Sequence, residues 1–190
     1  MNWFDTYKEK LAHRSRTMKM ALDHINMGSD RIMVETGCIR MKDDWGAGMS
    51  TLVLGDFAKE FGLTLYTVDI NPESMELCKE ITKDFSSAIS YNVNDSISFL
   101  QTFKKPIDFL YLDSMDCPPD DAQDSPVLLQ SQNHQLEEFK AAEDKLAPHA
   151  VVMLDDCRFP NGGKCGMSKP YLRLKGWSCL LEEYQSVWTR

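Results

Sequence analysis

The sequence has no C-x-x-C pair, no long apolar run and no excess of positive charge. Its six cysteines are scattered along 190 residues, which argues against a structural zinc site and against a redox dithiol. The longest apolar run, Ala150 to Leu154, is far shorter than the roughly 20 residues of a membrane span. The N-terminal segment lacks the apolar stretch of a signal peptide. We therefore expect a cytoplasmic protein with reduced cysteines and no membrane partner.

The charge balance argues against a broad, non-specific surface for nucleic acid. Lys and Arg number 21 and Asp and Glu number 29, which gives a net charge of −8. Hydrophobic residues make up 43% and charged residues 26%, as is typical of a globular protein and not of a disordered or coiled-coil one. The length suits one domain. We expect a single domain over residues 1–190, with a helical extension over residues 1–28. The sequence does not indicate the oligomeric state.

Short runs of branched apolar residues alternate with amphipathic segments. Near-continuous apolar strands between helices are typical of a parallel sheet that is covered on both faces, so we predict a doubly wound α/β fold. Predicted N-caps for three of the helices are Ser50, Asn71 and Asp95, and a further helix is expected to begin at Ser131. The predicted strands are RIMVETG, LTLYTVD, AISYNV, IDFLYLD and residues 150–155, followed by a terminal pair, SCLLEEY and QSVWTR.

Acidic residues stand at or near the end of each of the first five predicted strands. Ligands of such sheets bind beyond the carboxyl ends of the strands, so these residues are candidates for a site. Carboxylates packed at one edge repel each other unless a cation neutralises them. An alternative for Asp95 is that it only caps a helix. The acids are Glu35, Asp69, Asp95, Asp113 and the pair Asp155–Asp156.

The segment after the first predicted strand, ETGCIRMKDDWGAGMST, is rich in glycine. Gly37, Gly46 and Gly48 allow a ligand to approach the backbone closely, and the helix start at Ser50 offers free N–H groups to an anionic group. The segment does not match G-x-G-x-x-G, because several residues separate Gly37 from Gly46, and this lowers the support for a dinucleotide site. The alternative is that these glycines only turn the chain.

The motifs VETG…GAGMST, LYTVDINP, YNVNDS, DFLYLDS and VVMLDD, in this order, resemble those of class I S-adenosylmethionine-dependent methyltransferases. The resemblance runs from about Arg31 to Asp156, and the insert CIRMKDDW departs from the family's pattern. It implies a Rossmann-like, mostly parallel seven-stranded sheet with a C-terminal antiparallel hairpin. It also implies that S-adenosylmethionine is the cofactor, bound through its methionine part by Glu35, Gly37, Gly48 and Ser50, through its ribose by Asp69, and through its adenine by Asp95 and Ser96.

The acids after the fourth and fifth strands are placed as in cation-dependent O-methyltransferases, including the catechol type and some sugar O-methyltransferases. This resemblance implies Mg²⁺ (or Ca²⁺) bound by Asp113, Asp155 and Asp156, and a small-molecule hydroxyl as methyl acceptor. Such a cation prefers oxygen ligands and lowers the pKa of a bound hydroxyl. The alternative is that these acids cap helices or pair with nearby basic residues.

The candidate catalytic residues are Asp113, Asp116 and His134. His134 is expected in the first turn of the helix after Ser131, where the helix dipole disfavours a charged imidazolium and keeps the ring a competent base. Asp116 alternatively belongs to a solvated acidic loop with Asp120, Asp121 and Asp124. Five basic residues and no acid occupy residues 158–175; they either face solvent or hold an anionic group of the acceptor. They are Arg158, Lys164, Lys169, Arg173 and Lys175.

The leading hypothesis is a small-molecule O-methyltransferase, with no nucleic-acid partner. A nicotinamide-dependent oxidoreductase is an alternative, since Asp69 would suit ribose binding there too, but the glycine motif is missing. A non-catalytic binding module with the same fold is a second alternative. The sequence does not indicate which molecule accepts the methyl group, or whether oxygen or nitrogen does.

Overall fold

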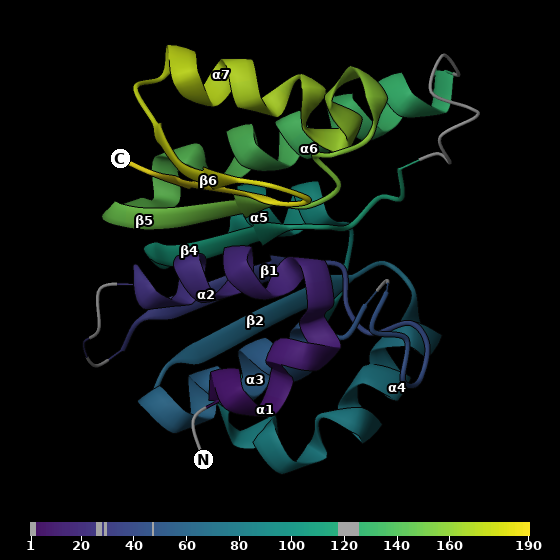
Figure 1. Ribbon diagram of the computed structural model, residues 1–190. Coiled ribbons are helices and arrows are strands. Elements are labelled where there is room, and N and C mark those ends of the chain that lie inside the picture. The colour runs from purple at the N-terminus through teal and green to yellow at the C-terminus, as the bar shows by residue number, and fades with distance from the viewer. Residues whose placement is uncertain (1–2, 26–27, 29, 47, 118–125) are drawn as a thin grey trace.

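A seven-stranded sheet organises the protein, whose computed structural model describes residues 3–25, 28, 30–46, 48–117 and 126–190 (Figure 1). The strand order is β3-β2-β1-β4-β5-β7-β6, and β7 runs antiparallel to both β5 and β6. The predicted doubly wound sheet with a C-terminal hairpin is confirmed. The strands are β1 (Ile32–Thr36), β2 (Thr64–Asp69), β3 (Ile89–Val93), β4 (Ile107–Leu112), β5 (Leu146–Leu154), β6 (Ser178–Glu182) and β7 (Ser186–Thr189).

Helices cover both faces of the sheet, because alternate residues of each strand point to opposite sides. Met33, Tyr111 and Met153 pack in a cluster with residues of α1, α2 and α3. Val34 and Leu154 pack on the other face with residues of α5, α6 and α7. The helices are α1 (Trp3–Leu11), α2 (Ser15–Asp23), α3 (Ser50–Phe61), α4 (Pro72–Ile81), α5 (Ser96–Thr102), α6 (Pro126–Ala142) and α7 (Ser168–Leu174).

Two of the predicted N-caps are confirmed and two predicted helix starts are wrong. Asn71 and Asp95 each accept hydrogen bonds from backbone N–H groups in the first turn of α4 and α5. The N-cap of α3 is Met49, and Ser50 is its first helical residue. Helix α6 begins at Pro126 and not at Ser131; proline favours a first-turn position because its missing N–H costs nothing there.

The N-terminal segment forms two helices, α1 and α2, with the 3₁₀ turn Ala12–Arg14 between them. Figure 1 shows both helices lying in front of the sheet. The buried Thr17 donates a hydrogen bond of 2.6 Å to Gln185, just before β7. This extension is therefore packed against the C-terminal hairpin. Within the part of the chain that the structure describes, helices long and apolar enough to cross a membrane are absent.

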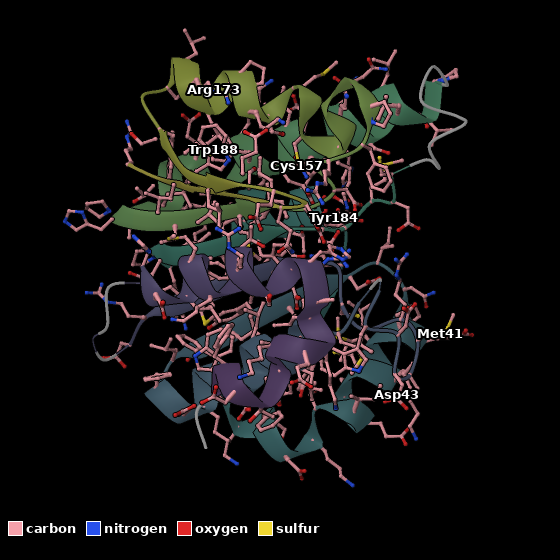
Figure 2. The ribbon with its side chains drawn as sticks, viewed as in Figure 1. Met41, Asp43, Cys157, Arg173, Tyr184 and Trp188 are labelled. Atoms are coloured by element: carbon pink, nitrogen blue, oxygen red, sulfur yellow. A yellow bond between two sulfur atoms is a disulfide. The ribbon has the colours of Figure 1, made fainter. Side chains whose placement is uncertain are left out.

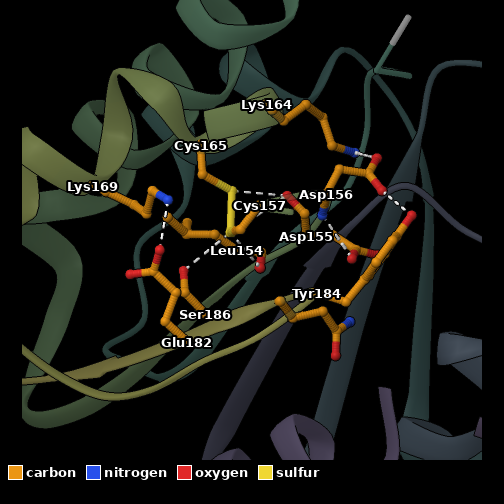
Figure 3. Close-up of a disulfide and its surroundings, with 12 residues drawn as sticks. Leu154, Asp155, Asp156, Cys157, Lys164, Cys165, Lys169, Glu182, Tyr184 and Ser186 are labelled. Carbon is orange, nitrogen blue, oxygen red and sulfur yellow. Dashed lines mark hydrogen bonds and ion pairs between the residues drawn. A yellow bond between two sulfur atoms is a disulfide. The ribbon is translucent and has the colours of Figure 1, made fainter. Parts of the chain in front are cut away.

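A disulfide joins Cys157 and Cys165, so the expectation that all cysteines are reduced is wrong for this pair. Both residues are buried, and their Cα atoms lie 5.1 Å apart. Sequence spacing alone did not indicate the pairing, because the bond depends on how the segment after β5 folds back. The bond closes this segment into a loop, which includes the 3₁₀ segment Pro160–Gly166 (Figure 3).

Removing this cross-link should destabilise the protein. For the double substitution Cys157→Ala and Cys165→Ala we expect the free energy of unfolding to fall by about 2.5 kcal/mol, because a short loop no longer restricts the unfolded chain. Urea denaturation measures the change, and the wild type in reductant should show a similar loss. Cys179→Ala, at an exposed cysteine outside the disulfide, is the control. Coincident curves for wild type and double variant would contradict the prediction.

Candidate active site

Several cavities lie at the carboxyl edge of the sheet, beside the segments that follow β1, β2, β4 and β5. One of these segments, between β1 and α3, projects from the molecule, as Met41 and Asp43 show in Figure 2. The side chain of Met41 is largely exposed. The predicted site residues come from the ends of several strands, and the fold brings them to this edge.

The first cavity has a volume of about 190 Å³ and carries three of the residues expected at the cofactor. Asp69 accepts hydrogen bonds from the backbone N–H of Cys38 at 3.2 Å and of Asn71 at 2.8 Å, one on each oxygen. Because a carboxylate oxygen has more than one lone pair, Asp69 keeps accepting capacity toward the cavity. The lining residues are Val68, Asp69, Ile70, Asp95, Ser96, Ser114, Met115 and His134.

Glu35 is fully buried near the end of β1. Its Oε2 accepts hydrogen bonds from Thr51 at 2.7 Å and from Thr67 at 3.1 Å. Burial raises the pKa of Glu35 to about 7, although the side chains of Ser50, Thr51 and Thr67 favour the charged form. Its Oε1 is buried without a hydrogen-bond partner among the described residues, so one oxygen is left for a further donor.

Gly37 allows β1 and β4 to bring their ends close together. Its φ is +87°, and a Cβ built there would lie 2.7 Å from the carbonyl oxygen of Asp113. A larger residue would push the two strand ends apart, so glycine is required here for two reasons. The alternative that Gly37 only turns the chain thus describes part of its role, and its predicted contact with the cofactor stays a prediction. Its carbonyl also accepts a hydrogen bond of 3.2 Å from Thr67.

The second cavity is narrow and joins the glycine-rich segment to the acids after β4 and β5. Arg14 from the N-terminal extension enters it and donates to the carbonyl of Gly46 at 2.7 Å. Trp45 and Met49 also line a larger outer cavity of about 310 Å³ beside α4. The residues of the second cavity are Leu11, Arg14, Met18, Trp45, Gly48, Met49, Ser50, Tyr111, Asp113 and Asp155.

The acids after β4 and β5 meet at this edge, together with two basic side chains. Lys164 Nζ lies 2.6 Å from Asp113 Oδ1 and 3.1 Å from Asp156 Oδ2, as Figure 3 shows for Asp156. Arg14 Nε lies 3.5 Å from Asp155 Oδ2. The alternative that these acids pair with basic residues is thus observed for Asp113, Asp155 and Asp156.

Three carboxylates facing two cations leave one carboxylate short of a counter-charge. Although burial opposes the charged form, Arg14 and Lys164 lower the pKa of Asp155. Burial and the neighbouring Asp155 raise the pKa of Asp113 well above its usual range. Asp113 therefore accepts a proton more readily than Asp155 does.

His134 lies on the first cavity and also shares a smaller cavity with Lys164. Its Nε2 is within 3.2 Å of Ser96 Oγ and 3.0 Å of Ser114 Oγ. The expected first-turn position is wrong, because α6 begins eight residues earlier, at Pro126. Although burial opposes it, the carboxylate of Glu138 raises the pKa of His134 by hydrogen bonding, which is opposite to the expected helix-dipole effect.

Asp116 faces solvent and pairs with Arg40 at 2.8 Å. This hydrogen bond lowers the pKa of Asp116, although partial burial opposes the change. A carboxylate with a lowered pKa is a poor proton acceptor near neutral pH. The neighbouring acids Asp120, Asp121 and Asp124 lie outside the described residues.

Sequence reasoning missed three residues that shape the acidic group. Arg14 lies far away in the sequence, in the N-terminal extension. Tyr111 donates to Asp155 Oδ2 at 2.6 Å, and Tyr184 donates to Asp156 Oδ1 at 2.6 Å. Lys164 was singled out by sequence, and its alternative role of facing solvent is wrong, because its side chain is buried beside Asp113 and Asp156. The alternation of β4 was the one signal available, since it places Tyr111 on the face that Asp113 also shares.

A family model described as a methyltransferase domain matches residues 45–157. The SAH-bound methyltransferase PaMTH1 of Podospora anserina is similar in fold, with a TM-score of 0.64, 14% identity, and coverage of 99% of this chain and 84% of that one. An O-methyltransferase of Thermotoga maritima has a TM-score of 0.60 and 12% identity, with coverage of 92% of this chain and 64% of that one. A putative rRNA-methylase of Clostridium thermocellum has a TM-score of 0.55 and 10% identity, with coverage of 90% of this chain and 95% of that one. Comparison with proteins of curated function finds no match.

Proposed function

The chain belongs to the class I S-adenosylmethionine-dependent methyltransferases, and we propose that it transfers the methyl group to a hydroxyl oxygen of a small molecule. The observation that carries the proposal is Asp113. This carboxylate lines the narrow second cavity beside Gly48 and Ser50 of the glycine-rich segment, and the nearest donor to its Oδ2 is Tyr111 Oη at 3.4 Å. A hydroxyl must lose its proton as it is methylated, and a carboxylate oxygen without a close donor is suited to accept it.

The described residues fit S-adenosylmethionine, which supplies an electrophilic methyl group on a positively charged sulfur. Asp69 has accepting capacity for the two ribose hydroxyls. Ile70 and Met115 give the first cavity apolar walls suited to an adenine ring, with Asp95 and Ser96 at its edge. The buried Glu35 Oε1 is in need of a donor, which suits the ammonium group of the methionine part.

The acceptor would bind where the second cavity meets Asp113. Asp113 Oδ1 is held by Lys164, while its Oδ2 lies 3.4 Å from Tyr111 Oη, at the long limit of a hydrogen bond. Oδ2 is thus available to a hydroxyl of the acceptor. Holding that hydroxyl in line with the methyl group supplies much of the rate. Trp45 and Met49 connect this point to the larger outer cavity, where the body of an acceptor would fit.

His134 is better suited to the cofactor than to proton removal from the acceptor. Its contacts with Ser96 and Ser114 support a role in shaping the first cavity. Asp116, paired with Arg40 and with a lowered pKa, is less suited than Asp113 to act as base. Of the three candidate catalytic residues, the geometry therefore supports Asp113 best.

The residues present do not fit the expected Mg²⁺ or Ca²⁺ at Asp113, Asp155 and Asp156. Lys164 lies between two of these carboxylates and Arg14 beside the third. Groups of three or more His, Cys, Asp or Glu with the spacing to hold a metal ion are absent from the described ranges. Metal assistance therefore stays a prediction, which chelation tests.

The cofactor assignment can be tested at Asp69. Asp69→Ala should weaken S-adenosylhomocysteine binding by about ten- to a hundredfold, because hydrogen bonds to a charged acceptor contribute about 1.5–3 kcal/mol. Isothermal titration calorimetry measures the affinity, with the exposed Asp144→Ala as control. An unchanged dissociation constant for Asp69→Ala would refute the assignment. Binding of NAD⁺ in place of S-adenosylhomocysteine would favour the oxidoreductase alternative.

The acceptor class is tested by following conversion of S-adenosylmethionine to S-adenosylhomocysteine with a catechol, a simple sugar, an aliphatic amine and ribosomal RNA. Methylation of a catechol or sugar supports the proposal. Methylation of the amine or the RNA contradicts it. RNA is included among the tested acceptors because the fold is similar to that of a putative rRNA-methylase. Turnover of none of them, with S-adenosylhomocysteine still bound, favours the binding-module alternative.

A further inference from the structure

The three carboxylates after β4 and β5 are already satisfied by donors of the chain itself. Asp155 Oδ1 accepts from the backbone N–H of Asp156 at 2.8 Å. Asp155 Oδ2 and Asp156 Oδ1 accept from Tyr111 and Tyr184, and Lys164 binds Asp156 Oδ2 and Asp113 Oδ1. Five of the six oxygens thus hold a close donor, and a divalent cation would have to displace several of them.

Lys164 is fixed in this position by its surroundings and is not a mobile surface side chain. Its side chain is 3% exposed. The next residue, Cys165, is tied to Cys157 by the disulfide, and the backbone N–H of Lys164 donates to the carbonyl of Asp156 at 3.2 Å. Figure 3 shows Lys164 reaching over the end of β5 from this loop. A buried ammonium is retained where carboxylates compensate its charge.

A second support for the loop comes from α6. Gln132 Nε2 donates to the carbonyl of Gly163 at 2.8 Å and to that of Asn161 at 3.2 Å. The backbone on the N-terminal side of Lys164 is therefore held from α6, and that on its C-terminal side by the disulfide. The position of the ammonium is built into the fold from both directions.

We propose that the ammonium of Lys164 takes the place of a divalent cation in this active site, and that Lys164 is a positioning residue which holds Asp113 for the acceptor. By binding Oδ1 of Asp113 and Oδ2 of Asp156, Lys164 keeps two carboxylates together that would otherwise repel each other. It leaves Asp113 Oδ2 directed to the acceptor. The role of Asp113 rests on the proposed function, whereas the exclusion of metal does not.

The proposal predicts that removing the ammonium creates a metal site. In Lys164→Ala, the carboxylates of Asp113 and Asp156 lose their cation and become available as oxygen ligands. We expect Mg²⁺ or Ca²⁺ to raise the melting temperature of this variant by about 5–10 °C at a concentration of a hundred times the dissociation constant. The wild type should melt at the same temperature in chelator and in Mg²⁺ or Ca²⁺. Differential scanning fluorimetry and calorimetry with the metal alone measure both effects.

Lys169→Ala is the matched control, because Lys169 is in α7 nearby and pairs with Glu182. It should lose a positive charge without gaining metal binding. Metal binding by the wild type, or a folded Lys164→Ala that binds no metal, would overturn the proposal. If Lys164→Ala does not fold in chelator, recovery of the folded state on adding Mg²⁺ or Ca²⁺ supports the proposal and failure to recover in either metal overturns it.

The positioning role of Lys164 is tested separately, with the variant Lys164→Arg. Arginine keeps the positive charge but changes the geometry at Asp113. We expect Lys164→Arg to lower kcat at least tenfold, with little change in S-adenosylhomocysteine affinity and no metal binding. An unchanged kcat would overturn the positioning role. Failure to bind S-adenosylhomocysteine in the wild type would instead contradict the proposed function and leave the metal result standing.

Discussion

Asp113→Asn is expected to lower kcat by about 10²–10⁴-fold, the usual contribution of a positioned general base. Asparagine has nearly the same shape but cannot accept the proton of an acceptor hydroxyl. The affinity for S-adenosylhomocysteine should change little, because the proposed ribose and adenine contacts are at the first cavity, which Asp113 does not line. The measurement is steady-state turnover of whichever hydroxyl compound the acceptor screen identifies, with binding followed by calorimetry.

Two further variants decide whether Asp113 is the base. Asp116→Asn tests the other carboxylate after β4, which pairs with Arg40 in an exposed position, and we expect a much smaller loss of kcat. Asp144→Asn, at an exposed residue far along the sequence, controls for loss of one negative charge. A large loss with Asp116→Asn and a small one with Asp113→Asn would reverse the assignment. Equal losses in both would mean that neither residue acts alone.

Gly163→Ala should destabilise the protein by about 3–5 kcal/mol, because it combines backbone strain with a direct clash. Gly163 has φ of +54° and ψ of −147°, a region essentially restricted to glycine. A Cβ there would lie 1.8 Å from the carbonyl oxygen of Asp156. Chemical denaturation gives the free energy of unfolding, and a change below about 1 kcal/mol would show that the loop adjusts easily.

Gly62→Ala separates the two causes. Gly62 ends α3 with φ of +69°, but a Cβ there would have no atom within 4 Å. Gly62→Ala should therefore lower the free energy of unfolding through backbone strain alone, by about 1–2 kcal/mol. If both variants lose the same stability, the contact with Asp156 contributes nothing. A folded Gly163→Ala should in addition lose part of the ordered arrangement around Lys164, since the two residues are adjacent.

The sheet could be predicted from the sequence because its strands are short apolar runs between clear helix signals. The predicted strand RIMVETG contains β1, and Asn71 with Pro72 correctly marks the start of α4. The start of α6 was placed too late because Ser131 looks like a cap, although it lies inside the helix and donates to the carbonyl of Val127. Pro126 was the better signal.

The site could be predicted only where it follows from strand ends. Asp69, Asp95 and Asp113 reach the sheet edge because parallel strands end there together, so order along the chain was enough. The partners of these acids were not predictable in the same way. Arg14 comes from the opposite end of the sequence, and Lys164 points inward because a disulfide and a glycine-dependent loop hold it there. Such placement depends on tertiary contacts that local pattern does not encode.

The insertion of β7 between β5 and β6 has a consequence for how the protein folds. This strand follows all the others in sequence, yet β5 remains an open edge until it docks. Thr17 and Gln185 are 168 residues apart along the chain when they meet, and contacts of such sequence separation form slowly, since a long loop must be closed first. Arg14, a partner of Asp155, and Tyr184, a partner of Asp156, belong to these contacts of long sequence separation. We therefore expect them to reach the acidic group after most of the sheet has formed, and local unfolding of either terminal segment to remove only that segment's contact while Tyr111 and Lys164 still hold the acids.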